Sequence, residues 1–144
     1  MSRKIFIGIL FYMMFSISGC TKPEDKIRGK WEISKIYKNN IETRLESPSQ
    51  VESLFSSWTF YRSTILIITY SYNAVLYETS GSWSLIQNND FLEVSFTDKY
   101  STIERRYTIK KFKANELKVS FVDQENIEWT FVFALQYSFQ DYDI

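Results

Sequence analysis

The chain has 144 residues, with 17 basic and 17 acidic side chains, a formal net charge of +0, one cysteine and no histidine. The absence of histidine removes the usual base at neutral pH and the usual nitrogen ligand of metal ions, and a lone cysteine cannot form an internal disulfide. The balanced charge gives no basic surface for nucleic acid, so we expect no metal, no cofactor and no nucleic-acid partner.

The N-terminal residues have the layout of a secretion signal. Residues 2–4 contain two basic side chains, and the apolar run at residues 5–15 is shorter than the ~20 residues that a membrane-spanning helix needs. Residues 17–20, Ile-Ser-Gly-Cys, resemble the lipobox of bacterial lipoprotein signal peptides. The resemblance implies that residues 1–19 are a lipoprotein signal peptide and that Cys20 carries the lipid. It also implies anchoring to the outer membrane of the cell envelope, facing either the periplasm or the cell surface.

Residues 20–27 are charged and contain a proline, as expected for a solvated, lipidated tether that leads into one domain at residues 28–144. A lysine followed by Glu24 and Asp25 is similar to the surface-export signals of some Bacteroidota lipoproteins. An ordinary polar linker would show the same charges, so both interpretations stay open.

The first strand is expected at residues 30–37, where Trp31 and Ile33 alternate with polar side chains. A break in the alternation at residues 35–36 suggests a bulge, and the Asn-Asn pair at residues 39–40 ends the strand.

One helix is expected at residues 48–56. Ser47 can cap it, a proline follows at the first helical position, and a glutamine stands at the third. The apolar side chains with helical spacing are Val51, Leu54 and Phe55.

The rest of the chain alternates strands with turns. Apolar and polar side chains alternate within each strand, and polar clusters separate one strand from the next. The expected strands are 57–61, 64–72, 74–86, 92–96, 103–112, 117–121 and 127–135. About eight strands, with one short helix between the first two, predict an all-β fold, an eight-stranded antiparallel up-and-down barrel.

Two Gly-x-Trp motifs point to a known family. Gly29 and Trp31 open the first strand, and Gly81 and Trp83 precede a turn and a Leu-x-Val-x-Phe strand. With the lipobox, they resemble the lipocalin-like lipoprotein domains of Bacteroidota over about residues 27–136. The resemblance implies a lipocalin-like barrel that these motifs help to close.

The last strand departs from the lipocalin pattern. Lipocalins usually place an arginine there, stacked over the first-strand tryptophan, and residues 127–136 contain none. Arg105 shares a strand face with Tyr107, and we predict that it stacks over Trp31 instead.

Residues 104–113 form the strongest charge cluster. Strand alternation places Arg106 and Lys110 on one face, and Lys111 and Lys113 on the other face with Arg105. The cluster is either a solvated strand or an anion clamp at the barrel rim.

An eight-stranded barrel is just wide enough to be filled by side chains or to hold one small ligand. The bulky inward aromatic residues favour a filled interior, whereas the helix at residues 48–56 lies where lipocalins carry the loop that covers the barrel mouth. If a cavity exists, the candidate ligand-binding residues are Val51, Leu54, Phe55, Arg105, Tyr107, Trp129 and Phe131.

The sequence gives no support for catalysis. Asp123, Glu125 and Glu128 are close together, but they fall in a turn and on the outward side of a strand, where solvated acids are common. We therefore predict a non-enzymatic, membrane-anchored envelope lipoprotein whose barrel binds a small hydrophobic ligand. The alternative is a protein- or glycan-interaction module that uses the barrel exterior or rim, with an envelope protein as partner.

Overall fold

The computed structural model describes residues 22–44, 57–97 and 102–144. Its elements in chain order are α2 (Pro23–Ile27), β1 (Gly29–Lys38), β2 (Ile41–Thr43), β3 (Ser57–Phe60), η3 (Arg62–Thr64), β4 (Ile65–Tyr72), β5 (Val75–Ile86), β6 (Phe91–Thr97), β7 (Thr102–Lys113), β8 (Glu116–Val122) and β9 (Glu128–Ser138).

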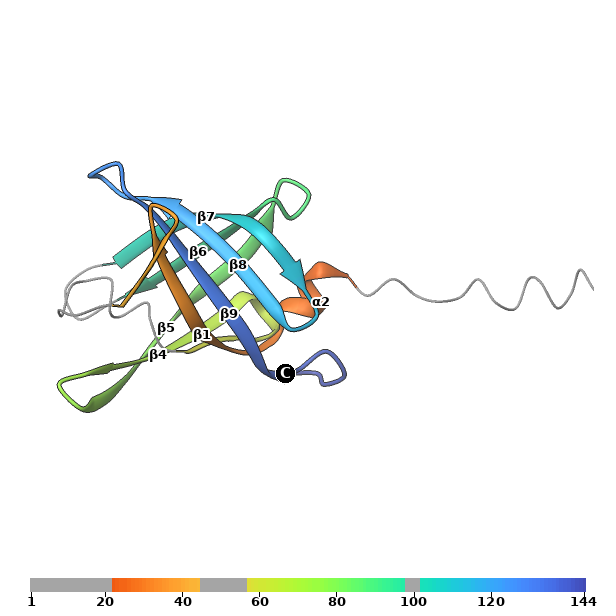
Figure 1. Ribbon diagram of the computed structural model, residues 1–144. Helices are drawn as coiled ribbons and strands as arrows, with labels where there is room; N and C mark the ends of the chain where they lie inside the picture. Colours follow the sequence, from red (N-terminus) through yellow and green to blue (C-terminus); the bar gives the residue numbers. More distant parts are fainter. Residues whose placement is uncertain (1–21, 45–56, 98–101) are drawn as a thin grey trace, which may run out of the picture.

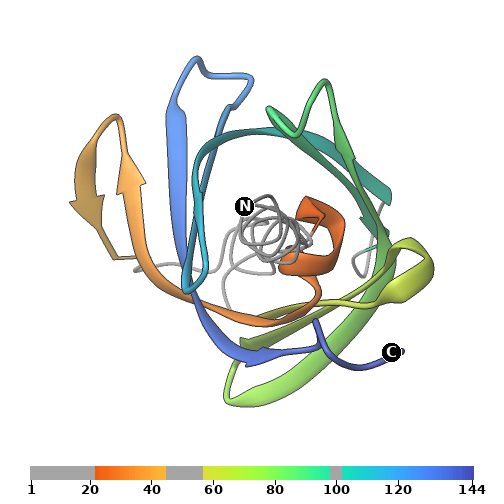
Figure 2. The same cartoon turned by 90° about the vertical axis from the view of Figure 1, so that its right-hand side faces the viewer.

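Eight of these strands close into an antiparallel barrel (Figures 1 and 2). Strands β3 to β9 pair with their neighbours in sequence, and β1 joins β3 on one side and β9 on the other. The β1–β9 ladder runs from Gly29 opposite Ser138 to Lys38 opposite Trp129. The predicted eight-stranded up-and-down barrel is therefore confirmed.

The ninth strand, β2, extends the wall beyond β3. β3 pairs only with the start of β1, up to Glu32, whereas β2 pairs with its end, from Ile36 to Lys38. Asn39 and Asn40 both have positive φ, as the two central residues of a tight hairpin turn require. The Asn-Asn pair predicts this turn, but the return strand leaves no signal in the sequence, because three residues are too few to show an alternation.

The residues directly before β1 form a short helix whose last residue packs against the barrel. Pro23–Ile27 form the short helix α2, and Ile27 is fully buried. Burying an isoleucine side chain stabilises a fold by about 1.5–3 kcal/mol, which explains why the segment packs rather than remaining solvated. Figure 1 shows α2 at one end of the barrel, and in the end-on view of Figure 2 it is seen in front of the opening of the ring of strands.

The helix predicted for residues 48–56 lies outside the described residues. No helix within the described ranges is long and apolar enough to span a membrane.

Aromatic rings fill the middle of the barrel. Trp58 lies 5.0 Å from Phe133 and 5.6 Å from Tyr107, measured between ring centroids, and all three side chains are fully buried. Tilted and edge-on pairs of this kind add about 0.5–1.5 kcal/mol each beyond the area they bury. This layer leaves the centre of the barrel occupied by side chains.

Both Gly-x-Trp motifs lie where neighbouring strands of the barrel approach each other closely. A Cβ at Gly29 would overlap the carbonyl oxygen of Tyr137 on β9, and Gly29 has φ of +149°, which side chains with a Cβ rarely adopt. A Cβ at Gly81 would likewise overlap the carbonyl oxygen of Ser95 on β6. Each glycine therefore permits a close approach between neighbouring strands.

The two tryptophans of these motifs fix the chain around one end of the barrel. The Trp31 Nε1 donates a hydrogen bond of 2.7 Å to the Ile27 carbonyl at the end of α2. The Trp83 Nε1 lies 3.1 Å from the carbonyl oxygens of both Tyr61 and Ile65, which flank η3. We call this end of the barrel the α2 end.

Arg28 ties the C-terminal tail to the α2 end. The residue is 8% exposed, and its guanidinium donates to the carbonyl oxygens of Gln140, Tyr142 and Ile144 at 3.5, 3.1 and 3.4 Å. Its Nη2 also lies 3.2 Å from the Asp25 carboxylate on α2. The tail therefore packs as part of the domain.

Candidate functional site

Half-buried apolar side chains face the interior at the end of the barrel opposite α2, which we call the far end. They come from β1, β4, β7 and β9, and each packs against the buried core: Ile33, Ile36, Tyr70, Ile103 and Trp129. Half-buried apolar side chains also occur toward the α2 end, where α2 lies at the opening of the barrel (Figures 1 and 2). The far end thus presents an apolar inner surface that is still accessible.

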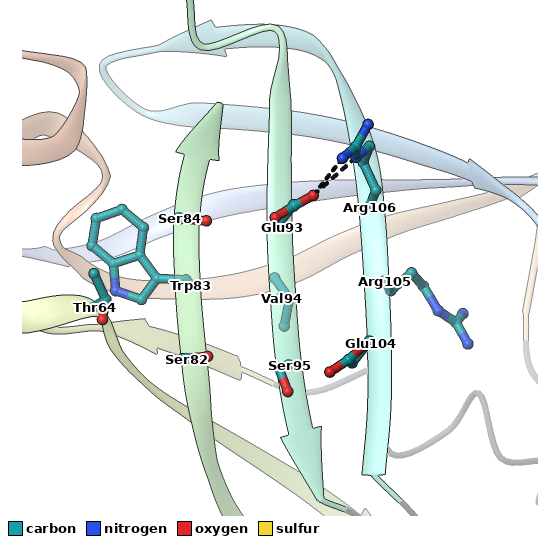
Figure 3. A pocket seen from close by; sticks show the side chains of 10 residues that line it. All are labelled: Thr64, Ser82, Trp83, Ser84, Glu93, Val94, Ser95, Glu104, Arg105 and Arg106. Atoms are coloured by element: carbon teal, nitrogen blue, oxygen red, sulfur yellow. Dashed lines mark hydrogen bonds and ion pairs between the residues drawn. The ribbon is translucent and has the colours of Figure 1, made fainter. Parts of the chain in front are cut away.

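Strand alternation on β7 brings a positive charge into this region. Ile103 and Tyr107 pack with the core, so Arg105 between them also points inward. Arg106 points outward and binds Glu93 on β6, with 2.6 Å between Nη2 and Oε1. Figure 3 shows Arg105 projecting away from the side chain of Glu104.

The Arg105 guanidinium lies against an aromatic ring and has no counterion among the described residues. Its Cζ is 4.0 Å from the centroid of the Phe121 ring, a favourable cation–π distance. Its Nη1 is buried and donates to no acceptor in the described part of the chain. Because buried donors almost always have an acceptor, this orphaned group marks an incomplete site.

Tyr107 adds a second orphaned donor beside Arg105. The side chain is fully buried, and its Oη has no hydrogen-bond partner among the described residues. Burial raises the pKa of the Tyr107 phenol well above its usual range, although the nearby Arg105 charge acts in the opposite direction. The phenol therefore keeps its proton at neutral pH and remains a donor.

The predicted stacking of Arg105 over Trp31 is wrong. Arg105 reaches Phe121, whereas Trp31 has Phe112 as a ring neighbour, at 6.3 Å between centroids. The last-strand arginine of lipocalins thus has no substitute in Arg105.

The predicted grouping of Lys111 with Arg105 on one face is also wrong. The register shifts between Ile109 and Lys111, so Phe112 packs with the core while Lys111 pairs with Glu116 at 2.7 Å. A bulge of this kind turns all later side chains over. Lys111 and Lys113 therefore do not share a face with Arg105, and the anion clamp predicted at the rim cannot include them. Among the charged residues of this cluster, Arg105 is the one that points inward.

Four predicted ligand-binding residues lie on β7 and β9, the two strands that flank β8. Phe131 is fully buried and lies 6.2 Å from Tyr107 and 5.7 Å from Phe121, between ring centroids. The grouped residues are Arg105, Tyr107, Trp129 and Phe131. The other three, Val51, Leu54 and Phe55, and the lipidation residue Cys20 lie outside the described residues.

Four members of the site, Ile33, Ile36, Tyr70 and Ile103, are not among the predicted ligand-binding residues. Ile103 could have been found, because it shares the alternation of Arg105 and Tyr107 on β7. Ile33, Ile36 and Tyr70 reach the far end only through the pairing of β1 and β4 with other strands, which alternation does not reveal.

Asp123 holds the β8–β9 turn and orients Trp129. Its carboxylate accepts hydrogen bonds of 2.9 Å from the backbone nitrogens of Glu125 and Ile127 and from the Trp129 Nε1. The Ile127 bond and then the Trp129 bond are the main causes that lower the pKa of Asp123. The Asp123 carboxylate therefore stabilises the β8–β9 turn at the far end.

A polar pocket of about 550 Å³ lies along β5, β6 and β7 (Figure 3). The Arg106–Glu93 ion pair lies at its wall, so these two charges already neutralise each other. Its lining residues are Thr64, Ser82, Trp83, Ser84, Glu93, Val94, Ser95, Glu104, Arg105 and Arg106. Within the described ranges, no three potential metal ligands come together.

Comparison with protein-family models and with curated proteins gives no match. Among solved structures, the chain is similar to an odorant-binding protein from bovine nasal mucosa, with a TM-score of 0.46 and 9% sequence identity, over 83% of this chain and 77% of that chain. This similarity is low, and the fold is defined by the strand pairing of the chain itself. An eight-stranded up-and-down barrel is the arrangement that lipocalins use.

Proposed function

We propose that the protein is a lipid-anchored protein of the bacterial cell envelope whose barrel binds a small hydrophobic ligand at the far end. The observation that carries the proposal is the half-buried apolar inner surface formed by Ile33, Ile36, Tyr70, Ile103 and Trp129. Binding sites for small molecules are typically concave and mostly apolar, and they often occupy the mouths of barrels.

The packed centre limits the size of the ligand. Trp58, Tyr107 and Phe133 are fully buried and occupy the middle of the barrel. A ligand that enters from the far end therefore stops at this layer, which favours a short molecule over one that runs the length of the barrel.

The anchor and the far end would lie on opposite sides of the domain. The lipobox-like segment ends at Cys20, and α2 begins at Pro23, so a lipid at Cys20 would hold the α2 end near the membrane. Exchange of Cys20→Ser should abolish incorporation of labelled palmitate and release the protein from the membrane fraction. Unchanged labelling would exclude Cys20 as the attachment residue.

Ligand binding can be tested with the full chain and an uncharged apolar probe, N-phenyl-1-naphthylamine. We expect Ile103→Trp, which fills the far end, to weaken probe binding about tenfold or more. The matched control is Leu85→Trp, which enlarges a half-buried interior side chain that is not part of the far-end set. Absence of probe binding by the wild type, or equal loss in both variants, would contradict a ligand site at the far end.

The alternative, an interaction module, is favoured by one observation at the rim. Apolar side chains on the far-end hairpins are strongly exposed, with Ile41 and Leu76 both at 71% and Val122 at 56%. A photo-crosslinking residue at Leu76 should capture an envelope protein if the rim docks on one. The matched control is Tyr137, which is 67% exposed on β9 near the α2 end. Capture at neither position, or at both equally, would speak against a rim interface.

A further inference from the structure

We infer that Arg105 and Tyr107 form the base of a carboxylate-binding subsite inside the barrel, so that the ligand is an amphiphile with a single anionic head group. This inference rests on the proposed function, because it specifies the ligand of the same far-end site. It is carried by two buried donors on the inward face of β7 that have no acceptor in the described part of the chain, Arg105 Nη1 and Tyr107 Oη.

One aromatic ring brings the two donors together. The Arg105 guanidinium lies 4.0 Å from the Phe121 centroid, and the Tyr107 ring lies 5.4 Å from the same centroid in an edge-on arrangement. Phe121 itself is 8% exposed and packs against Phe131. The ring therefore holds both side chains and limits the rotamers they can adopt, as a binding site requires.

The chemistry of the donors fits a carboxylate. A guanidinium binds carboxylate oxygens through directed N–H groups, and a neutral phenol donates one further hydrogen bond. The two orphaned donors match the two oxygens of one carboxylate. A buried donor without an acceptor carries an uncompensated desolvation cost, so a ligand that accepts from both donors gains binding energy.

The charge of the site favours a head group with one negative charge. Arg105 makes no ion pair with any described residue, and its outward neighbour Arg106 is already paired with Glu93. The core-facing side chains of the described strands are otherwise apolar or neutral. One cation balances a carboxylate, whereas a phosphate monoester would keep an uncompensated charge in a poorly solvated place.

The surrounding side chains set the orientation of the ligand. The filled layer at Trp58 and Phe133 lies behind Tyr107, so the apolar part of the ligand has to extend toward the far end. There the apolar part can contact Ile103 on β7 and Trp129 on β9, which pairs with Phe121 of β8. The charged head thus lies deep and the apolar tail near the opening.

The test compares two probes of equal chain length, decanoate and decan-1-ol, in binding to the full chain. We expect decanoate to bind about tenfold or more tightly than decan-1-ol. Arg105→Gln should remove this preference while binding of decan-1-ol stays the same. Tyr107→Phe should weaken decanoate binding several-fold, with the melting temperature showing that the variant is folded.

Two further variants distinguish the loss of a contact to the head group from a general loss of stability or binding. Arg106→Gln, one position along β7 but outward-facing, should leave the preference for decanoate intact. Arg105→Lys should retain part of it, because the charge remains. Equal binding of the two probes by the wild type, or loss of both probes in Arg105→Gln, would overturn the carboxylate subsite and leave the proposed function standing. Binding of neither probe by the wild type would overturn both.

Discussion

At the scale of single residues, Trp31 links the start of the domain to the barrel. The indole is fully buried, and its N–H satisfies the Ile27 carbonyl that ends α2. The Gly-x-Trp motif therefore acts through two physical effects, close strand packing at Gly29 and a buried hydrogen bond at Trp31.

Trp31→Phe should lower the free energy of unfolding by about 2–4 kcal/mol, since it removes both a buried donor and ring volume. Chemical denaturation measures this change. Trp129→Phe is the matched control, because that indole is only half-buried and donates to the solvent-accessible Asp123. An equal loss in the two variants would contradict the special role of Trp31.

Gly81→Ala should destabilise the barrel by about 2–4 kcal/mol, because the new Cβ would overlap the Ser95 carbonyl oxygen and force β5 and β6 apart. The neighbouring substitution Ser80→Ala, on an exposed side chain, should change the stability by no more than about 0.5 kcal/mol. Similar melting temperatures for the two variants would show that the strands have room to relax.

At the scale of elements, the hairpins of the barrel were readable in the sequence. Strong alternation, as in Leu92, Val94 and Phe96, together with polar turns, located every described strand except β2. Other features were less predictable: the bulge after Ile109 depends on pairing with β8, the gathering of Ile33, Ile36 and Tyr70 at the far end depends on strand pairing, and the burial of Ile27 depends on the closed barrel. Local patterns do not contain these long-range contacts.

The β8–β9 turn should depend on the charge of Asp123. Asp123→Ala should cost about 1–2 kcal/mol at pH 7, because three donors lose their acceptor, whereas Asp123→Asn should cost less. The pKa of Asp123 is lowered in the folded state, so its stabilisation is present above its unfolded pKa of about 3.9 and is lost as the pH falls through the folded value. Chemical denaturation at pH 7 and in acid should therefore show that the difference in the free energy of unfolding between wild type and Asp123→Ala becomes smaller below about pH 4. A difference that is independent of pH would contradict this role.

The C-terminal tail should stabilise the α2 end through Arg28. Deletion of residues 139–144 should lower the free energy of unfolding by about 2–3 kcal/mol, because it leaves a buried guanidinium without its carbonyl acceptors. Combining the deletion with Arg28→Met should cost less than the sum of the two separate changes, since the unsatisfied charge is gone. Additive losses in this double-mutant cycle would show that the tail acts independently of Arg28.

At the scale of the whole molecule, the barrel has two different ends. The α2 end is secured by the buried Ile27 and by Arg28, which holds the tail. The far end combines an apolar inner surface with the deeper donors of Arg105 and Tyr107, which have no acceptor in the described part of the chain. This asymmetry is the basis for assigning anchoring to one end and ligand binding to the other.

The four tryptophans allow one measurement to test this assignment, because Trp129 lies at the far end, Trp58 in the central layer, and Trp31 and Trp83 toward the α2 end. The measurement is a titration of the ¹⁵N-labelled full chain with decanoate, followed through the indole N–H signals. Binding at the far end predicts that the Trp129 signal shifts in a saturable manner while those of Trp31 and Trp83 stay in place. A shift of Trp31 or Trp83 without one of Trp129, or no saturable shift at all, would contradict it.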